Sequence, residues 1–115
     1  MNRKHKFSVK CAETFKNILI LLQDSLFTDA MAAVKNIFAE NSAGSFSLEL
    51  ADTWISIAAI LENGADFIYG KKIKTELLIC KNKPEKALAE LNDIVNMGIN
   101  DEDTDYLSDL LKNHS

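Results

Sequence analysis

At 115 residues the chain has the length of one domain and can bury a hydrophobic core without disulfides or metals. Apolar residues make up 47% and charged residues 26%, which excludes a disordered chain. One proline and four glycines are too few for a turn-rich all-β fold. The net charge of −4 gives no overall support for nucleic-acid binding. Composition therefore predicts a single all-α domain over residues 1–115 that does not bind nucleic acid.

The first residues have a basic stretch at 2–6, and we expect residues 1–6 to form a disordered tail. The apolar run at 18–22 is too short for a signal peptide, which needs about 7–15 apolar residues, or for a membrane span, which needs about 20. Cys11 and Cys80 have no C-x-x-C spacing and lie in helical patterns, so we predict reduced, buried or half-buried thiols. These features predict a cytoplasmic protein without a membrane span.

Apolar residues spaced by three and four predict a first helix that ends near residue 24. Thr28 is the expected N-cap of a second helix, and residues 41–45 have the composition of a loop. A third helix is predicted over 46–62, with Asn63 and Gly64 ending it. The expected apolar faces are Phe7, Cys11, Phe15, Ile18 and Leu22, then Ala30, Met31, Val34, Ile37 and Phe38, then Leu50, Ala51, Trp54, Ile57, Ala58 and Leu61.

A fourth helix is predicted over residues 66–81. Gly70 lies inside it and weakens it by about 1 kcal/mol, which leaves open whether the helix is continuous. Asn82 and Glu85 have the spacing of a capping box for a fifth helix, with Pro84 in its first turn. The apolar residues of these two helices are Phe67, Ile73, Leu77 and Cys80, then Ala87, Leu88, Leu91, Ile94 and Val95.

Gly98 is expected to stop the fifth helix, and a sixth helix is predicted to begin near Asn100. The acidic residues at 101–103 suit the positive end of that helix dipole, and residues 113–115 are expected to fray. The apolar face of this helix is Tyr106, Leu107, Leu110 and Leu111. Six helices with short connections are therefore predicted.

Two segments, 30–38 and 87–95, share one pattern. In each, a small residue is followed by apolar residues one, four, seven and eight positions later, and each segment follows a helix and a tight turn. A small residue early in the second helix of a hairpin allows close packing in stacked helical repeats. The alternative is a chance match between two amphipathic helices.

Two other segments, 17–22 and 54–61, are apolar around most of the helix circumference and need cover on most sides. In a curved helical array they would leave an inner apolar surface for a partner. In a compact bundle they would be central core helices, and this alternative stays open.

The sequence offers little catalytic chemistry. His5 and His114 lie at the two ends, no cysteine or histidine has metal-ligand spacing, and the acidic run 101–105 lacks the glycine and final glutamate of a calcium loop. The two basic groups, at residues 3–6 and 71–74, are predicted to be solvated surface, with phosphate contacts as the alternative. We therefore expect neither an enzyme nor a metal or cofactor site.

The segment 54–67, a helix followed by a Gly-Ala-Asp-Phe turn, resembles the small tetratricopeptide-like chaperones of bacterial type III secretion needle subunits, the YscG/PscG-like proteins. Segments 87–95 and 106–112 resemble the C-terminal helices of that family. The resemblance covers about 15–112. It departs from the family in a shorter stretch between residues 67 and 82 and in an extra residue, Ala65.

The resemblance implies a cytoplasmic bacterial chaperone with helical hairpins in an α-α superhelix. Its groove would hold the amphipathic C-terminal helix of a small secreted needle subunit, and a small helical co-chaperone would pack on its N-terminal helices. By pattern, the groove would be lined by Leu50, Trp54, Ile57, Leu61, Phe67, Leu77 and Leu78. The co-chaperone contact would fall on Phe15, Leu19, Leu22 and Phe38.

Each of those residues has a core position as its alternative. A different function also stays open, namely a compact helical regulatory or immunity-type module that binds a partner through its acidic outer surface.

Overall fold

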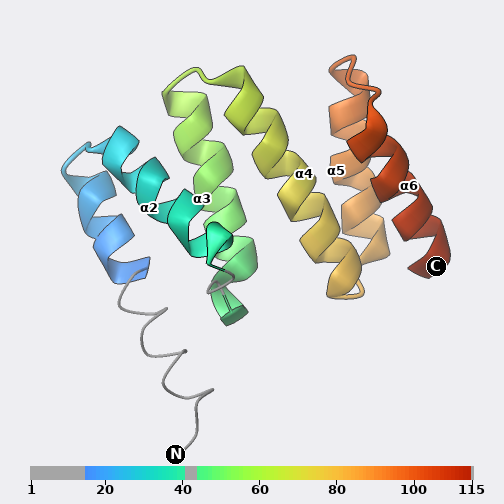
Figure 1. Ribbon diagram of the computed structural model, residues 1–115, viewed down its shortest axis with the longest axis horizontal. Helices are drawn as coiled ribbons and strands as arrows, with labels where there is room; N and C mark the ends of the chain where they lie inside the picture. Colours follow the sequence, from blue (N-terminus) through green and yellow to red (C-terminus); the bar gives the residue numbers. More distant parts are fainter. Residues whose placement is uncertain (1–14, 41–43, 115) are drawn as a thin grey trace, which may run out of the picture.

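The computed structural model describes residues 15–40 and 44–114, which form helices joined by short turns (Figure 1). Within those ranges there is no strand, so the predicted all-α class is confirmed. Phe7, Cys11 and the basic tail lie outside the described residues. The helices are residues 15–23, α2 (Phe27–Ala39), α3 (Ser47–Ile60), α4 (Gly64–Cys80), α5 (Pro84–Asn96) and α6 (Glu102–His114), with a 3₁₀ turn, η1 (Gly44–Phe46), before α3.

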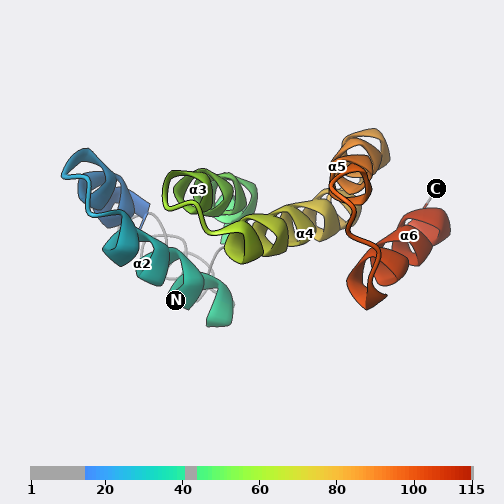
Figure 2. The ribbon, with the colours of Figure 1, turned by 90° about the horizontal axis from the view of Figure 1, so that it is seen from above.

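Successive helices run in opposite directions and alternate between two layers (Figure 2). Helix 15–23, α3 and α5 form one layer, and α2, α4 and α6 form the other. The Cα atoms span 39 × 37 × 20 Å, and the shortest of these dimensions is about two helix diameters. The described chain is thus a thin, two-layered array of helical hairpins, as predicted.

Four of the helices end in the same tight turn. The turn residues Ser25, Glu62, Asn82 and Gly98 have φ values of 59°, 56°, 60° and 88°, in the left-handed region. At each turn this residue donates its N–H to a carbonyl three residues back, and the next residue donates to a carbonyl five residues back. These paired bonds satisfy carbonyls that the helix end leaves free. Three of the four turn residues are not glycine, so composition alone did not reveal them.

Helix starts differ from the predictions at three places. α2 begins at Phe27, one residue before Thr28, so Thr28 is not its N-cap. Asn63 does not merely end α3, because its side chain accepts a hydrogen bond from Asp66 N at 3.1 Å and caps α4. Gly64, also expected to end α3, is instead the first residue of α4, which begins two residues earlier than predicted. The capping box at Asn82 is also wrong, since Asn82 is the left-handed turn residue and no side chain caps α5.

Other predicted ends are correct. Pro84 is the first residue of α5, and the helix ends two residues before Gly98. α6 begins one residue after Asp101, whose carboxylate accepts from Thr104 N at 3.0 Å, while the Thr104 hydroxyl accepts from Asp101 N at 2.9 Å. α6 continues through residues 113 and 114.

The buried apolar side chains form two separate clusters. The N-terminal core lies among helix 15–23, α2 and α3, and the C-terminal core lies among α4, α5 and α6. α4 contributes to both, because its Phe67 and Ile73 pack on the first cluster and its Leu78 and Ile79 belong to the second. The N-terminal core comprises Ile18, Ala30, Met31, Val34, Ile37, Leu50, Trp54, Ile57 and Ala58; the C-terminal core comprises Leu78, Ile79, Ala87, Leu91 and Leu107.

α4 is continuous through Gly70, which answers the question left open by the sequence. Gly70 is buried against α3, where a Cβ atom would come within 2.8 Å of Trp54 Cδ1 and 3.0 Å of Ile55 Cγ1. The glycine therefore allows the close approach of α3 and α4 and does not break the helix.

Candidate functional site

The seven predicted groove residues do not share one open surface. Leu50, Trp54, Ile57 and Leu78 have at most 4% of their surface exposed and pack inside the two cores, so the core alternative describes their packing. Phe67 and Leu77 are half-buried. Leu61 is 40% exposed at the end of α3.

The four predicted co-chaperone contacts all lie on the N-terminal half. Phe15, Leu22 and Phe38 are half-buried and pack on the N-terminal core. Leu19 is 47% exposed, and Ile20 beside it is 45% exposed. Leu19 is thus the one member of this set that presents a largely free apolar side chain.

Trp54 joins three helices from within the structure. Its Nε1 donates to Asp66 O at 2.9 Å, which satisfies the buried indole N–H. The Phe38 ring meets it nearly edge-on at 5.7 Å between centroids, and the Tyr69 ring lies 5.5 Å away. Trp54 therefore holds α2, α3 and α4 together.

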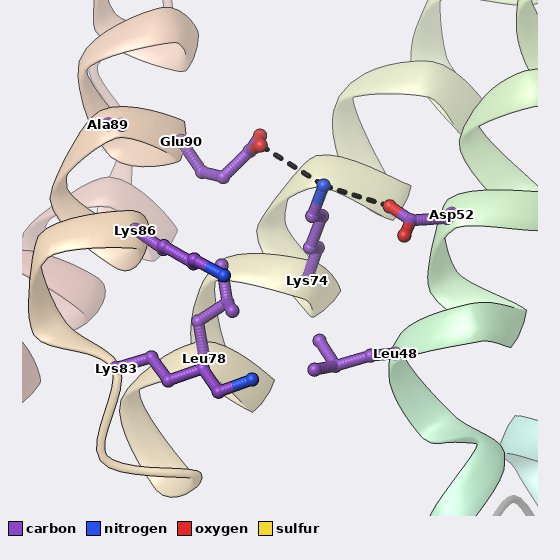
Figure 3. Close-up of a pocket in the computed structure, with 8 residues that line it drawn as sticks. All are labelled: Leu48, Asp52, Lys74, Leu78, Lys83, Lys86, Ala89 and Glu90. Carbon is purple, nitrogen blue, oxygen red and sulfur yellow. Dashed lines mark ion pairs between the residues drawn. The ribbon is translucent and has the colours of Figure 1, made fainter.

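A hollow of about 290 Å³ opens between α3 and α5, with α4 beneath (Figure 3). Its apolar lining comes from one residue on each helix: Leu48 of α3, Leu78 of α4 and Ala89 of α5. Of the predicted groove residues, Leu78 alone lines this hollow. Among the described residues, the lining is Leu48, Asp52, Lys74, Leu78, Lys83, Lys86, Ala89 and Glu90.

Lys74 bridges the two walls of the hollow. Its Nζ lies 2.8 Å from Asp52 Oδ1 and 3.2 Å from Glu90 Oε1, and Figure 3 shows it reaching between them. Burial lowers the pKa of the Lys74 amine, but hydrogen bonds and charge attraction from Asp52 and Glu90 outweigh it, so the net pKa is raised above 10.5. Lys74 is therefore a charged link between α3 and α5.

Lys71 links α4 to α5, and Lys72 links α4 to residues 101–103 at the start of α6. Lys71 Nζ lies 3.0 Å from Glu90 Oε2 and 3.3 Å from Asp93 Oδ2. Glu90 Oε2 accepts no hydrogen bond, so its contact with Lys71 is an ion pair alone. Lys72 Nζ lies 2.7 Å from Asp101 Oδ2 and 2.8 Å from Asp103 Oδ2.

The prediction of a solvated basic group at 71–74 is therefore wrong for these side chains. Those of Lys71, Lys72 and Lys74 are only 12%, 14% and 24% exposed, and each contacts two carboxylates. Three lysines in four residues gave no sign of this, because the five acidic partners lie on α3, on α5 and at residues 101–103. We call Lys71, Lys72 and Lys74 the lysine row.

Lys83 and Lys86 differ from the lysine row. Both are exposed at the start of α5 on one wall of the hollow, and neither side chain has an ion-pair or hydrogen-bond partner among residues 15–40 and 44–114. Their sequence signal was their position around Pro84, because lysine at the positive end of a helix dipole is unfavourable for helix stability. Sequence reasoning missed both.

A second, smaller hollow of about 170 Å³ lies between α4 and α6, lined in part by Tyr69, Glu76 and Leu107. Tyr106 nearby is 53% exposed, and a hydrogen bond with Glu76 raises the pKa of its phenol. Cys80, predicted to be buried or half-buried, is exposed at the last position of α4.

Within the described ranges, no three histidine, cysteine or acidic side chains are placed to hold a metal ion. No helix there is long and apolar enough to cross a membrane. The α3–α5 hollow offers aliphatic surface beside free ammonium groups, a combination that can bind apolar and anionic side chains of a polypeptide.

Comparison with known proteins gives no relative: no family model, no curated protein and no solved structure matches this chain.

Proposed function

We propose that this protein is a non-catalytic binding protein that holds a segment of a partner protein in the hollow between α3 and α5. The observation that carries the proposal is the open hollow itself, whose apolar lining comes from three different helices (Figure 3). Its volume of about 290 Å³ is at the lower limit of ordinary ligand pockets. It therefore suits a few side chains of a longer segment better than a whole cofactor.

The segment is expected to be helical. An extended peptide needs a sheet edge or other free backbone groups to bond with, and the described residues offer no strand. A helix satisfies its own backbone and needs only a trough for one apolar face. The hollow between α3 and α5, with Leu78 of α4 in its lining, supplies such a trough.

The resemblance to needle-subunit chaperones gives a narrower proposal. The bound helix would be the C-terminal helix of a small secreted needle subunit, kept from self-association in the cytoplasm until export. A co-chaperone would cover the exposed Leu19 and Ile20. The fit of a chaperone to this chain rests on the resemblance, on the hollow and on these exposed apolar residues.

Co-expression tests the proposal. The chain is produced with each small helical protein encoded beside its gene, and stable complexes are measured by size-exclusion chromatography with light scattering. Ala89→Trp fills the hollow from an exposed helical position. We expect it to abolish complex formation while leaving the circular dichroism spectrum unchanged.

Ala32→Trp is the matched control, because Ala32 is an exposed alanine on α2, away from the hollow. A complex that forms equally well with Ala89→Trp would refute binding in the hollow. A hollow-dependent complex with a partner that is not secreted would refute the needle-chaperone proposal and leave the general one standing.

A further inference from the structure

The hollow contains more positive than negative charge, although the chain as a whole is negative at −4. Three lysines and two carboxylates line it: Lys74, Lys83 and Lys86 against Asp52 and Glu90. Lys74 binds both carboxylates within 3.2 Å. Both acids are therefore paired with Lys74, and the described lining has a net charge of +1. Lys83 and Lys86 are the two lysines of this lining whose ammonium groups have no carboxylate partner among the described residues.

Fold stability does not explain Lys83 and Lys86. Lys83 is the N-cap residue of α5, yet its side chain makes no capping bond. Lys86 lies in the first turn of the same helix, where the dipole favours acidic side chains. The four lysine–carboxylate pairs of Lys71 and Lys72 show that nearby lysines of this chain do have partners where the fold uses them.

We propose that the hollow selects a helical partner segment that carries a carboxylate beside its apolar side chains, with Lys83 and Lys86 contacting that carboxylate. This inference rests on the proposed function and names the chemistry of the occupant. The apolar side chains of the segment pack on Leu48, Leu78 and Ala89. The N-terminus of α5 adds its own positive end to the attraction.

The geometry fixes where the acidic residue enters. In Figure 3, Lys83 and Lys86 extend from the start of α5, whereas Lys74 lies between Asp52 of α3 and Glu90, which is four residues after Lys86 on α5. A carboxylate near Lys74 would meet Asp52 and Glu90, which repel it. The acidic side chain of the partner helix is therefore expected beside the start of α5. On that helix it lies at the edge of the apolar face that packs into the hollow.

Three synthetic helical peptides test this. Each has about 20 residues, long enough to form a helix in water, and the same leucine face. They carry glutamate, glutamine or lysine at the edge of that face, and binding is followed by fluorescence anisotropy at low salt. The glutamate can form two exposed ion pairs, with Lys83 and Lys86. We therefore expect the glutamate peptide to bind about fivefold more tightly than the glutamine peptide, and the lysine peptide to bind most weakly.

The variant Lys83→Glu/Lys86→Glu is expected to reverse this order. The control is Lys16→Glu/Lys81→Glu, which changes the net charge equally at two exposed lysines that do not line the hollow. If the control reverses the order as well, the preference comes from overall charge and the inference is overturned.

Ala89→Trp separates the inference from the proposed function. If all three peptides bind with equal affinity and Ala89→Trp blocks them, charge selection is overturned and the proposed function stands. If none of the peptides binds, both are overturned. A preference for glutamate that survives Lys83→Glu/Lys86→Glu overturns the assignment to these two lysines.

Discussion

The two halves of this protein are held together by different proportions of apolar contact and ion pairing. Among the described residues, the N-terminal core buries nine apolar side chains, one of which is Trp54. The C-terminal core buries five and is supplemented by the ion pairs that Lys71 and Lys72 make with acids of α5 and of residues 101–103. α4 is common to both. The comparison shows that one thin array of helices can join neighbours either by apolar contact or by half-buried charge pairs.

The register of α4 shows the difference directly. The residue eight positions after the N-cap residue is Val34 in α2, Leu91 in α5 and Lys71 in α4. Val34 and Leu91 are buried aliphatic residues, whereas Lys71 is a charged residue facing Glu90 and Asp93. α4 contacts α3, α5 and α6, and the carboxylates that pair with its lysines lie on α3, on α5 and at residues 101–103.

The largest effect is expected for Trp54→Ala. Removing this side chain leaves a cavity in the N-terminal core and removes the indole hydrogen bond to Asp66 O, so the free energy of unfolding should fall by about 3–5 kcal/mol. Urea denaturation followed by circular dichroism measures the loss. Hydrogen exchange should show earlier loss of protection in α2 and α3 than in α5 and α6; equal loss in both halves would show that the two cores unfold as one.

Gly70→Ala tests the close approach of α3 and α4. A methyl group 2.8 Å from Trp54 Cδ1 is too close, and overpacking of about 1–3 kcal/mol should exceed the roughly 1 kcal/mol that alanine adds to helix stability. We expect a net loss of about 1–2 kcal/mol in urea. Gly64→Ala is the control, since a Cβ there has no atom within 4 Å, and it should be neutral or stabilising. If the Gly70→Ala protein were as stable as the parent protein, the packing role of the glycine would be contradicted.

Glu90→Gln tests the C-terminal half. The substitution removes the negative charge shared by Lys71 and Lys74, and we expect a loss of about 1–2 kcal/mol, between the values for surface and buried pairs. The difference from the parent protein should narrow in 1 M salt, where screening acts within about 3 Å. Asp109→Asn changes an exposed acid of α6 outside this network and should have little effect; equal losses would mean that only net charge matters.

The smallest effect is expected for the pH dependence of the stability that Asp101 contributes. Burial lowers the pKa of Lys72, but hydrogen bonds with Asp101 and Asp103 outweigh it and leave the pKa raised above 10.5, while the hydrogen bond with Lys72 holds the pKa of Asp101 below 3.8. The ion pair of Lys72 and Asp101 therefore stabilises the fold at pH values between the ordinary pKa of aspartate, 3.8, and that of lysine, 10.5. Its contribution is lost as pH rises through the raised pKa of Lys72 or falls through the lowered pKa of Asp101.

The Tm difference between the parent protein and Asp101→Asn should thus be greatest near neutral pH and decrease at both extremes. Asparagine can still accept the hydrogen bond from Thr104 N, so the substitution changes mainly the charge. A difference that does not vary with pH would show that the ion pair adds nothing to stability.

Much of the fold could be predicted from the sequence, because helix periodicity and Pro84 depend on near neighbours in the chain. The loop at 41–45 is only partly described, and its last two residues begin η1. The errors arose where one residue has two possible roles. Asn82 fits both a cap and a left-handed turn, and Asn63 both ends one helix and caps the next.

Of the residues that the sequence predicted to line a groove, only Leu78 lines the hollow between α3 and α5. The apolar pattern marked Leu50, Trp54 and Ile57 as important, but the same pattern describes a core residue and a groove residue, and only the packing of α2 and α4 separates them. Lys83 and Lys86 were overlooked because a basic residue in a turn is ordinary by itself.

The sequence by itself determined the all-α class and the helical hairpins, because backbone bonds and amphipathic faces are local properties of the chain. The tertiary structure alone decided that the lysine row is paired, that Gly70 joins α4 to Trp54, and that a hollow opens between α3 and α5. Each of these depends on residues from different helices. Their distances are set by packing, which the order of residues along one helix does not specify.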